Sequence, residues 1–151
     1  MGTEQDKSVI ELSVFDEFIH KSGLPINPAS IQKNSGQSEP DITCELVGDG
    51  FVTFELVEIC DSELAEKLAF MHSGGELSPN SYNDPSHKII CNKLGKSYRT
   101  NLPIELLCYT SGRVVPPDDM LLAEIRSACD KSRGQFRRVW LLGEKGNLYE
   151  V

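Results

Sequence analysis

The sequence has no long apolar run: nowhere does it hold the roughly 18 consecutive apolar residues that a helix needs to cross a bilayer. Its first residues, MGTEQDKS, also lack the basic start and the apolar stretch of a secretory signal. We therefore expect a soluble, cytoplasmic protein with no membrane partner.

Motifs of several common enzyme classes are missing too. The chain has no P-loop and no dinucleotide-binding glycine pattern. The three histidines, His20, His72 and His87, show no metal-ligand spacing and have no evident Ser or Cys partner. A nucleophilic site built on histidine is therefore poorly supported.

Paired cysteines are also lacking. The five cysteines are odd in number, and no two of them form a CxxC pair. Each lies in an apolar stretch, where a free cysteine behaves as a small hydrophobic residue. The pattern argues against zinc ligation and against a disulfide framework.

Basic residues are scarce in the first half of the chain. Residues 1–75 hold 4 basic and 14 acidic residues, whereas residues 76–151 hold 11 basic and 9 acidic ones, for a total charge of −8. The sharpest basic cluster contains His87, Lys88, Lys93, Lys96 and Arg99. The negative total charge argues against a broad DNA-coating protein. It does not argue against a local nucleic-acid site, because nucleic-acid affinity follows a local basic surface.

The remaining composition is that of one ordinary globular domain, with 151 residues, 39% hydrophobic and 25% charged. Apolar periodicity predicts helices over 8–22, 62–72, 86–98 and 118–131, the first opened by a capping box of Ser8 and Glu11. It predicts strands over 42–47, 51–60, 104–109, 136–142 and 147–151. Gly48-Asp49-Gly50 predicts a hairpin between the first two strands.

This order of elements predicts the α/β class: a mixed sheet flanked by helices, in a single domain over 1–151. The Pro-, Gly- and Asn-rich stretches 25–40 and 73–86 are expected to be loops. The run from Ile104 to Tyr109 is apolar without alternation, which is typical of a strand buried on both faces. Arg137 and Arg138 are neighbours on a predicted strand and are expected to point to opposite faces.

Two acids of the predicted hairpin form a candidate site. Asp41 opens the first strand, and Glu55 lies on the second strand, so that hairpin pairing can bring them together. Two convergent carboxylates suit Mg²⁺, which takes few protein ligands and keeps its waters. Such an ion can activate water and neutralise charge on a phosphodiester. The alternative is that both acids are solvated or cap the strands.

The helix at 8–22, Pro40-Asp41 at a strand, Glu55 on the next strand and the buried run IELLCY together resemble the PD-(D/E)xK (restriction endonuclease-like) nuclease superfamily. Thirteen residues separate Asp41 from Glu55. The resemblance spans about residues 8–142 and implies a core of a helix, three strands, a helix and a further strand. It also implies Mg²⁺ bound by Asp41 and Glu55, with a glutamate of the first helix (Glu11 or Glu17, of which we take Glu11) assisting the metal.

The sequence departs from the family pattern at the lysine two residues after the second acid, because Val57 stands there. In this family the lysine positions the attacking water, and some members supply it from the neighbouring helix. The resemblance therefore implies Lys93 as the third catalytic residue beside Asp41 and Glu55, with Lys96 as the other candidate. The alternative is that the lysines of 86–99 are solvated on a helix surface.

Two functions follow from these residues. The first is a Mg²⁺-dependent endonuclease, a hydrolase of nucleic-acid phosphodiesters. The second is a nuclease-like fold without catalysis that binds a basic protein, as an immunity protein or antitoxin does. Val57 and the acidic first half favour the second function, since opposite fields steer association.

Overall fold

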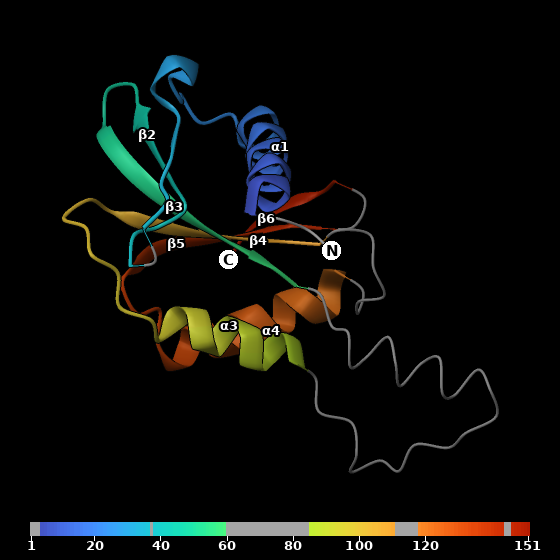
Figure 1. Cartoon of the computed structure of the whole chain (residues 1–151). Coiled ribbons are helices and arrows are strands. Elements are labelled where there is room, and N and C mark those ends of the chain that lie inside the picture. The colour runs from blue at the N-terminus through green and yellow to red at the C-terminus, as the bar shows by residue number, and fades with distance from the viewer. Residues whose placement is uncertain (1–3, 37, 60–84, 111–117, 144–145) are drawn as a thin grey trace, which may run out of the picture.

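The computed structural model describes residues 4–36, 38–59, 85–110, 118–143 and 146–151. These residues form an open six-stranded sheet with helices on both faces (Figure 1). The elements are α1 (Glu4–Ser22), η1 (Pro28–Ser30), β1 (Gln32–Lys33), β2 (Ile42–Leu46), β3 (Gly50–Glu58), α3 (Pro85–Leu94), β4 (Ile104–Tyr109), α4 (Asp118–Lys131), β5 (Phe136–Leu142) and β6 (Leu148–Glu150).

The sheet is mixed, and its strands follow the chain in the order β1-β2-β3-β4-β5-β6. The first three strands are antiparallel, β3, β4 and β5 are parallel, and β6 is antiparallel to β5. The predicted α/β class and mixed sheet are therefore confirmed.

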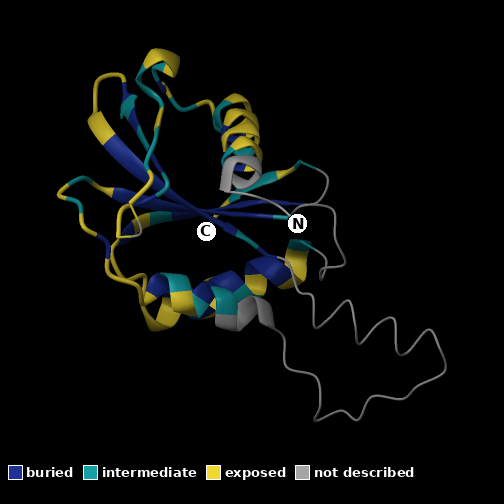
Figure 2. Ribbon diagram, viewed as in Figure 1, coloured by how far each residue is buried: buried dark blue, intermediate teal, exposed yellow. Residues whose placement is uncertain are grey.

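The central strand β4 is buried at every residue, as its unbroken apolar sequence predicted. Two cores account for this burial, one on each face of the sheet. On one face α1 inserts Phe15 and Phe18 against Phe54 of β3. On the other face α3 and α4 contribute Ile90 and Leu121. Figure 2 shows buried residues on the strands and exposed ones on the outer sides of the helices.

The predicted hairpin joins β2 to β3. Its turn places Gly48 and Gly50 both at a φ of 88°, a conformation that favours glycine because it has no Cβ. The register pairs Thr43 with Thr53 and Ile42 with Phe54. This register brings the start of β2 beside the middle of β3, where Glu55 lies.

Two predicted helix ends are corrected. The first helix begins at Glu4 and not at Ser8, so the Ser8-Glu11 pair does not cap it. The helix at 86–98 is α3 and ends at Leu94, because Gly95 follows and disfavours helix. Tyr98 therefore lies outside the helix to which its spacing assigned it.

The predicted loop 25–40 contains η1 and β1, whose short lengths leave little periodicity to read. The last residues of the predicted loop 73–86 are already the start of α3. The predicted helix 62–72 and most of that loop lie outside the described residues.

Arg137 and Arg138 do not point to opposite faces. The β4–β5 register shifts between Ile104 and Glu105, so that Glu105 pairs with Arg138 and Arg137 is the extra residue. Both arginines consequently reach the Glu105 carboxylate, at 3.0 and 3.8 Å.

Cys44, Cys108 and Cys129 are buried free thiols, and Cys91 is half-buried. Cys60 lies outside the described residues. No helix in the described ranges combines the length and the apolar character needed to span a membrane.

Candidate functional site

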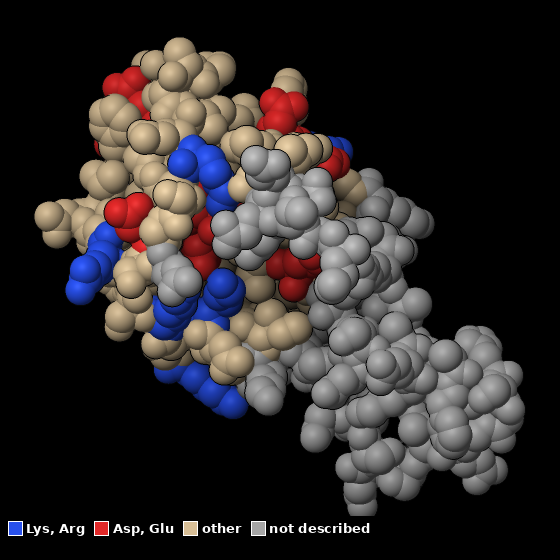
Figure 3. All heavy atoms as spheres, in the orientation of Figure 1, with Lys and Arg blue, Asp and Glu red and all other residues tan. Residues whose placement is uncertain are grey.

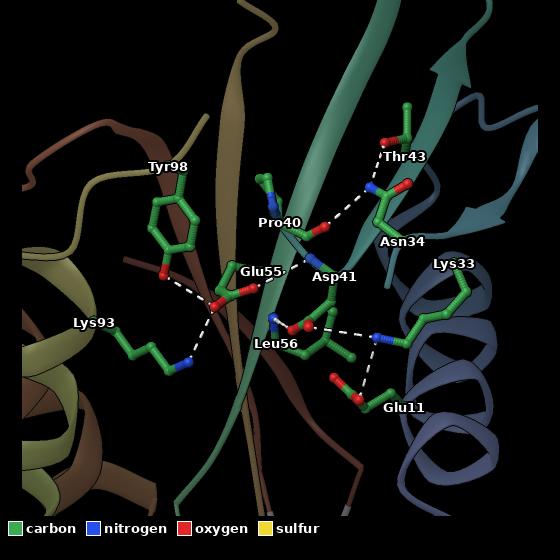
Figure 4. A network of polar contacts seen from close by, with 10 residues as sticks. All are labelled: Glu11, Lys33, Asn34, Pro40, Asp41, Thr43, Glu55, Leu56, Lys93 and Tyr98. Carbon is green, nitrogen blue, oxygen red and sulfur yellow. Dashed lines mark hydrogen bonds and ion pairs between the residues drawn. The ribbon is translucent and has the colours of Figure 1, made fainter. Parts of the chain in front are cut away.

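Charged side chains from five elements or their flanks meet between α1 and α3 (Figure 4). They form a row of Lys93, Glu55, Asp41, Lys33 and Glu11, with Tyr98 beside Glu55. The three predicted catalytic residues and the predicted assisting glutamate are thus brought together.

The hairpin positions Asp41 and Glu55 against each other. The backbone N–H of Asp41 donates to Glu55 Oε1 at 3.2 Å. The Leu56 N–H donates in turn to Asp41 Oδ2 at 2.9 Å. Since the β2–β3 ladder ends at Ile42, this carboxylate takes the place of a strand partner for Leu56. Both acids are therefore held by the backbone.

The second oxygen of Glu55 is shared by two donors. Lys93 Nζ on α3 and the hydroxyl of Tyr98 each lie 3.0 Å from Oε2. Lys93 thus approaches Glu55 from the neighbouring helix, while Val57 is buried among the apolar residues under α3 and α4. Lys96 makes no such contact, and its ammonium lies 5.1 Å from the centre of the Tyr98 ring.

Lys33 is a second lysine of the site, which sequence reasoning missed. Its ammonium bridges two carboxylates, at 3.3 Å from Glu11 Oε1 and 3.4 Å from Asp41 Oδ1. Glu11 is buried on α1, whereas Glu17 on the same helix is exposed. The structure therefore distinguishes the two glutamates that the sequence left open for this position.

Crowded carboxylates dominate the electrostatics. Burial and the neighbouring charge of Asp41 raise the pKa of Glu55, an effect that Lys93 offsets in part. Burial and Asp41 likewise raise the pKa of Glu11 against the opposing effect of Lys33. Burial alone would raise the pKa of Asp41, but its hydrogen bonds with Glu55 and Leu56 and the charge of Lys33 lower it.

The turn between α4 and β5 contacts Tyr98 and the end of α3 that carries Lys93. The Tyr98 N–H donates to Gln135 Oε1 at 2.6 Å, and its ring packs on Phe136. Next to these residues, Gly134 has a φ of 58°, and a Cβ there would lie 1.9 Å from the Leu94 carbonyl oxygen. This close approach fixes the end of α3 one residue after Lys93.

A cavity of about 470 Å³, here called the site cavity, opens in front of the carboxylates. Asp41, Glu55, Lys93 and Lys96 line it together with Gly36, Ser38 and Glu39 of the β1–β2 loop. The face seen in Figure 3 carries acidic atoms between groups of basic atoms in this region. The cavity can therefore admit a cation to the acids and a phosphate to the lysines.

The donor set fits Mg²⁺. Asp41 and Glu55 present hard carboxylate oxygens to one cavity, and Mg²⁺ in proteins commonly takes one or two carboxylates and keeps waters. Within the described residues no three or more His, Cys, Asp and Glu side chains form a metal-ligand group. The predicted ligands are thus a carboxylate pair, with Glu11 as a third carboxylate that Lys33 already contacts.

Lys33 and Asn34 were missed because their stretch was expected to be a loop. Asn34 Nδ2 donates to the Pro40 carbonyl at 2.9 Å and to Thr43 Oγ1 at 2.8 Å, which holds the peptide before Asp41. Tyr98 was predicted only as an apolar helix residue. No sequence signal distinguished these three residues, since their roles depend on contacts between distant segments.

Comparisons with known proteins return no match. No protein-family model matches the chain, and no curated protein or solved structure matches it significantly.

Proposed function

We propose that this chain is a Mg²⁺-dependent, PD-(D/E)xK-like nuclease that hydrolyses nucleic-acid phosphodiesters. One observation carries the proposal: Lys93 places its ammonium 3.0 Å from Glu55 Oε2, beside Asp41, although Val57 occupies the motif position. Two acids and a lysine, the residue types of that motif, therefore line one cavity.

The order of elements supports the proposal. From α1 to β4 the described elements are α1, the 3-10 helix η1, β1, β2, β3, α3 and β4, with residues 60–84 between β3 and α3 outside the described ranges and β4 parallel to β3. Apart from η1, these described elements follow the order helix, three strands, helix and strand of the superfamily's core. Asp41 opens the middle strand of the three and Glu55 lies on the last, as in the superfamily pattern.

Each side chain has a defined task in this proposal. Asp41 and Glu55 hold the ion, which when bound lowers the pKa of water and offsets charge on the phosphodiester. Lys93 orients the attacking water and neutralises charge on the phosphate. Lys33 favours the ionised forms of Glu11 and Asp41, and Tyr98 fixes the direction of the Glu55 carboxylate.

The test is cleavage of labelled DNA and RNA with Mg²⁺ or Mn²⁺ by the parent chain and by Asp41→Asn, Glu55→Gln and Lys93→Ala. We expect the two acid variants to lose about a hundredfold or more in rate, because both ion ligation and charge are lost. Lys93→Ala should lose more than its matched control Lys96→Ala, since Lys96 does not contact Glu55. Circular dichroism checks that each variant is folded.

Calorimetry with Mg²⁺ or Mn²⁺ on the parent and on Asp41→Ala completes the test. Binding that Asp41→Ala abolishes supports the site. Equal cleavage by the parent and Asp41→Asn contradicts the assignment.

A second function is an inactive nuclease-like module that binds a basic protein. The observation in its favour is that Lys33 and Lys93 already pair with all three carboxylates, which offsets two of the three negative charges without a metal. Absence of both metal binding and cleavage, together with a 1:1 complex that salt weakens, would favour this second function.

A further inference from the structure

A second polar cavity adjoins the site cavity. It has a volume of about 160 Å³ and is lined by Asn34, Pro40, Thr43, Thr53, Arg99 and Thr100, with Glu39 on the side shared with the site cavity. We call it the Arg99 pocket. It has no role in the chemistry proposed above.

The walls of the two cavities are joined by the backbone. The Arg99 N–H donates to the Ser38 carbonyl at 2.7 Å, which ties the segment after α3 to the β1–β2 loop. Arg99 directly follows Tyr98, whose hydroxyl contacts Glu55, and consecutive Cα atoms lie only about 3.8 Å apart. The Arg99 pocket therefore begins one residue away from a partner of the candidate catalytic acid.

The Arg99 pocket offers hydrogen-bond donors. Arg99 is exposed, and no described residue forms a hydrogen bond or ion pair with its guanidinium. Thr43 Oγ1 accepts from Asn34 and Thr100 Oγ1 accepts from the Leu102 N–H, so each hydroxyl keeps its own hydrogen to donate. A guanidinium with two hydroxyl donors is an arrangement that binds a phosphate.

Glu39 is the one acid in the lining. Its side chain lies against Gly36 of the β1–β2 loop: a Cβ added at Gly36 would lie 3.2 Å from the Glu39 Cδ. The two cavities thus differ in their linings: the site cavity has three carboxylates and two lysines, whereas the Arg99 pocket has one arginine, one carboxylate (Glu39) and three threonines. A metal ion in the site cavity would contact one phosphate of a polynucleotide, and the donors of the Arg99 pocket would contact the next phosphate.

We propose that the Arg99 pocket binds the phosphate next to the one that is cleaved, so that the substrate is a polynucleotide strand with at least two consecutive phosphates. This inference deepens the proposed function and rests on it for the cleavage step. It excludes small molecules with one phosphodiester as the preferred substrate, since these leave the pocket empty.

The experiment measures binding of a short fluorescein-labelled oligothymidylate by anisotropy, in EDTA and low salt, to the parent, Arg99→Gln and Arg126→Gln. Arg126 is the matched control because it is an exposed arginine of α4. We expect Arg99→Gln to weaken binding about tenfold and to reduce the salt slope by about 0.7, the value for one phosphate contact on a single strand. Arg126→Gln should match the parent.

Hydrolysis of bis(4-nitrophenyl) phosphate, a single phosphodiester, with Mn²⁺ separates the two proposals. Arg99→Gln should hydrolyse it like the parent while cleaving the oligonucleotide more slowly. The inference is overturned if the parent does not bind the oligonucleotide, if Arg99→Gln binds it like the parent, or if Arg126→Gln weakens binding equally. Arg99-dependent binding without hydrolysis of either substrate would support the pocket and overturn the nuclease proposal.

Discussion

Two buried glutamates on adjacent strands, Glu55 of β3 and Glu105 of β4, have opposite surroundings. Glu55 faces the site cavity. It accepts hydrogen bonds from a lysine (Lys93) and a tyrosine (Tyr98), and the neighbouring carboxylate of Asp41 raises its pKa. Glu105 is fully buried, and it accepts from Trp140 Nε1 at 2.7 Å and from Arg137 Nε at 3.0 Å. Neither the site cavity nor the Arg99 pocket includes it.

The surroundings of the two glutamates distinguish a buried acid that stabilises the fold from one that is available for chemistry. Burial alone does not distinguish them, because both side chains are almost inaccessible to solvent. Their hydrogen-bond and charge partners do distinguish them. Glu105 accepts from Trp140 and the positively charged Arg137, whereas Glu55 lies beside the Asp41 carboxylate and an open cavity. A bound cation would relieve the repulsion between two neighbouring carboxylates, whereas a carboxylate that is already paired with an arginine gains little from one.

The largest expected effect comes from Glu105→Ala. Removal of this carboxylate leaves Trp140 and Arg137 without their buried acceptor, and breaking such a pair costs about 3–5 kcal/mol of unfolding free energy. Urea unfolding measures the loss. A loss below about 1 kcal/mol would show that Glu105 is not a structural residue and would remove the contrast with Glu55.

Glu55→Gln should have a smaller effect on stability, and one that depends on pH. Because the pKa of Glu55 is raised in the folded chain, the parent binds this proton more tightly when folded and loses stability as pH rises above the ordinary value of 4.5. The variant lacks this loss. Its stability relative to the parent should therefore increase by about 1 kcal/mol toward pH 7, a usual size for one site.

Thermal unfolding of the parent and of Glu55→Gln between about pH 4.5 and pH 7 measures this difference. Glu58→Gln is the matched control, since Glu58 lies on the same strand and lines neither of the two cavities. A constant difference between the parent and Glu55→Gln at all pH values would contradict the assigned crowding.

The smallest expected effect is that of Tyr98→Phe. The hydroxyl donates to Glu55 Oε2 and so stabilises its charged form; without it the pKa of Glu55 should rise further while the fold is kept. NMR titration of the glutamate carboxyl carbons measures this change. Tyr149→Phe, which removes a hydroxyl bound to Asp118, should leave the Glu55 titration unchanged.

Much of the fold could be predicted because its signals are local. The unbroken apolar run of β4, the acids and lysine at the two ends of α4, and the glycines of the β2–β3 turn each occupy one short stretch. The start of α1 was wrong because a capping pattern can also occur inside a helix. The prediction that Arg137 and Arg138 point to opposite faces was wrong because a register shift with β4 decides the direction of their side chains.

The candidate site was predictable only in part. Asp41 and Glu55 meet because a hairpin pairs them, which local sequence indicates. Lys93 came from a family resemblance, and its contact with Glu55 depends on how α3 packs. Lys33 and Tyr98 carried no signal, since a two-residue strand and a residue after a helix gain their roles only from tertiary contacts.

The origin of the site lysine on α3 also bears on the order of folding. With a lysine at position 57, both acids and their cation would lie within one hairpin, which forms through local contacts. Here Lys93 is 38 residues from Glu55 in sequence and Tyr98 is 43 residues away. Closing such loops is slow relative to hairpin formation. Asp41 and Glu55 therefore meet early, whereas Glu55 stays without Lys93 until α3 docks, so that the full set of ion pairs exists only in the completely folded chain.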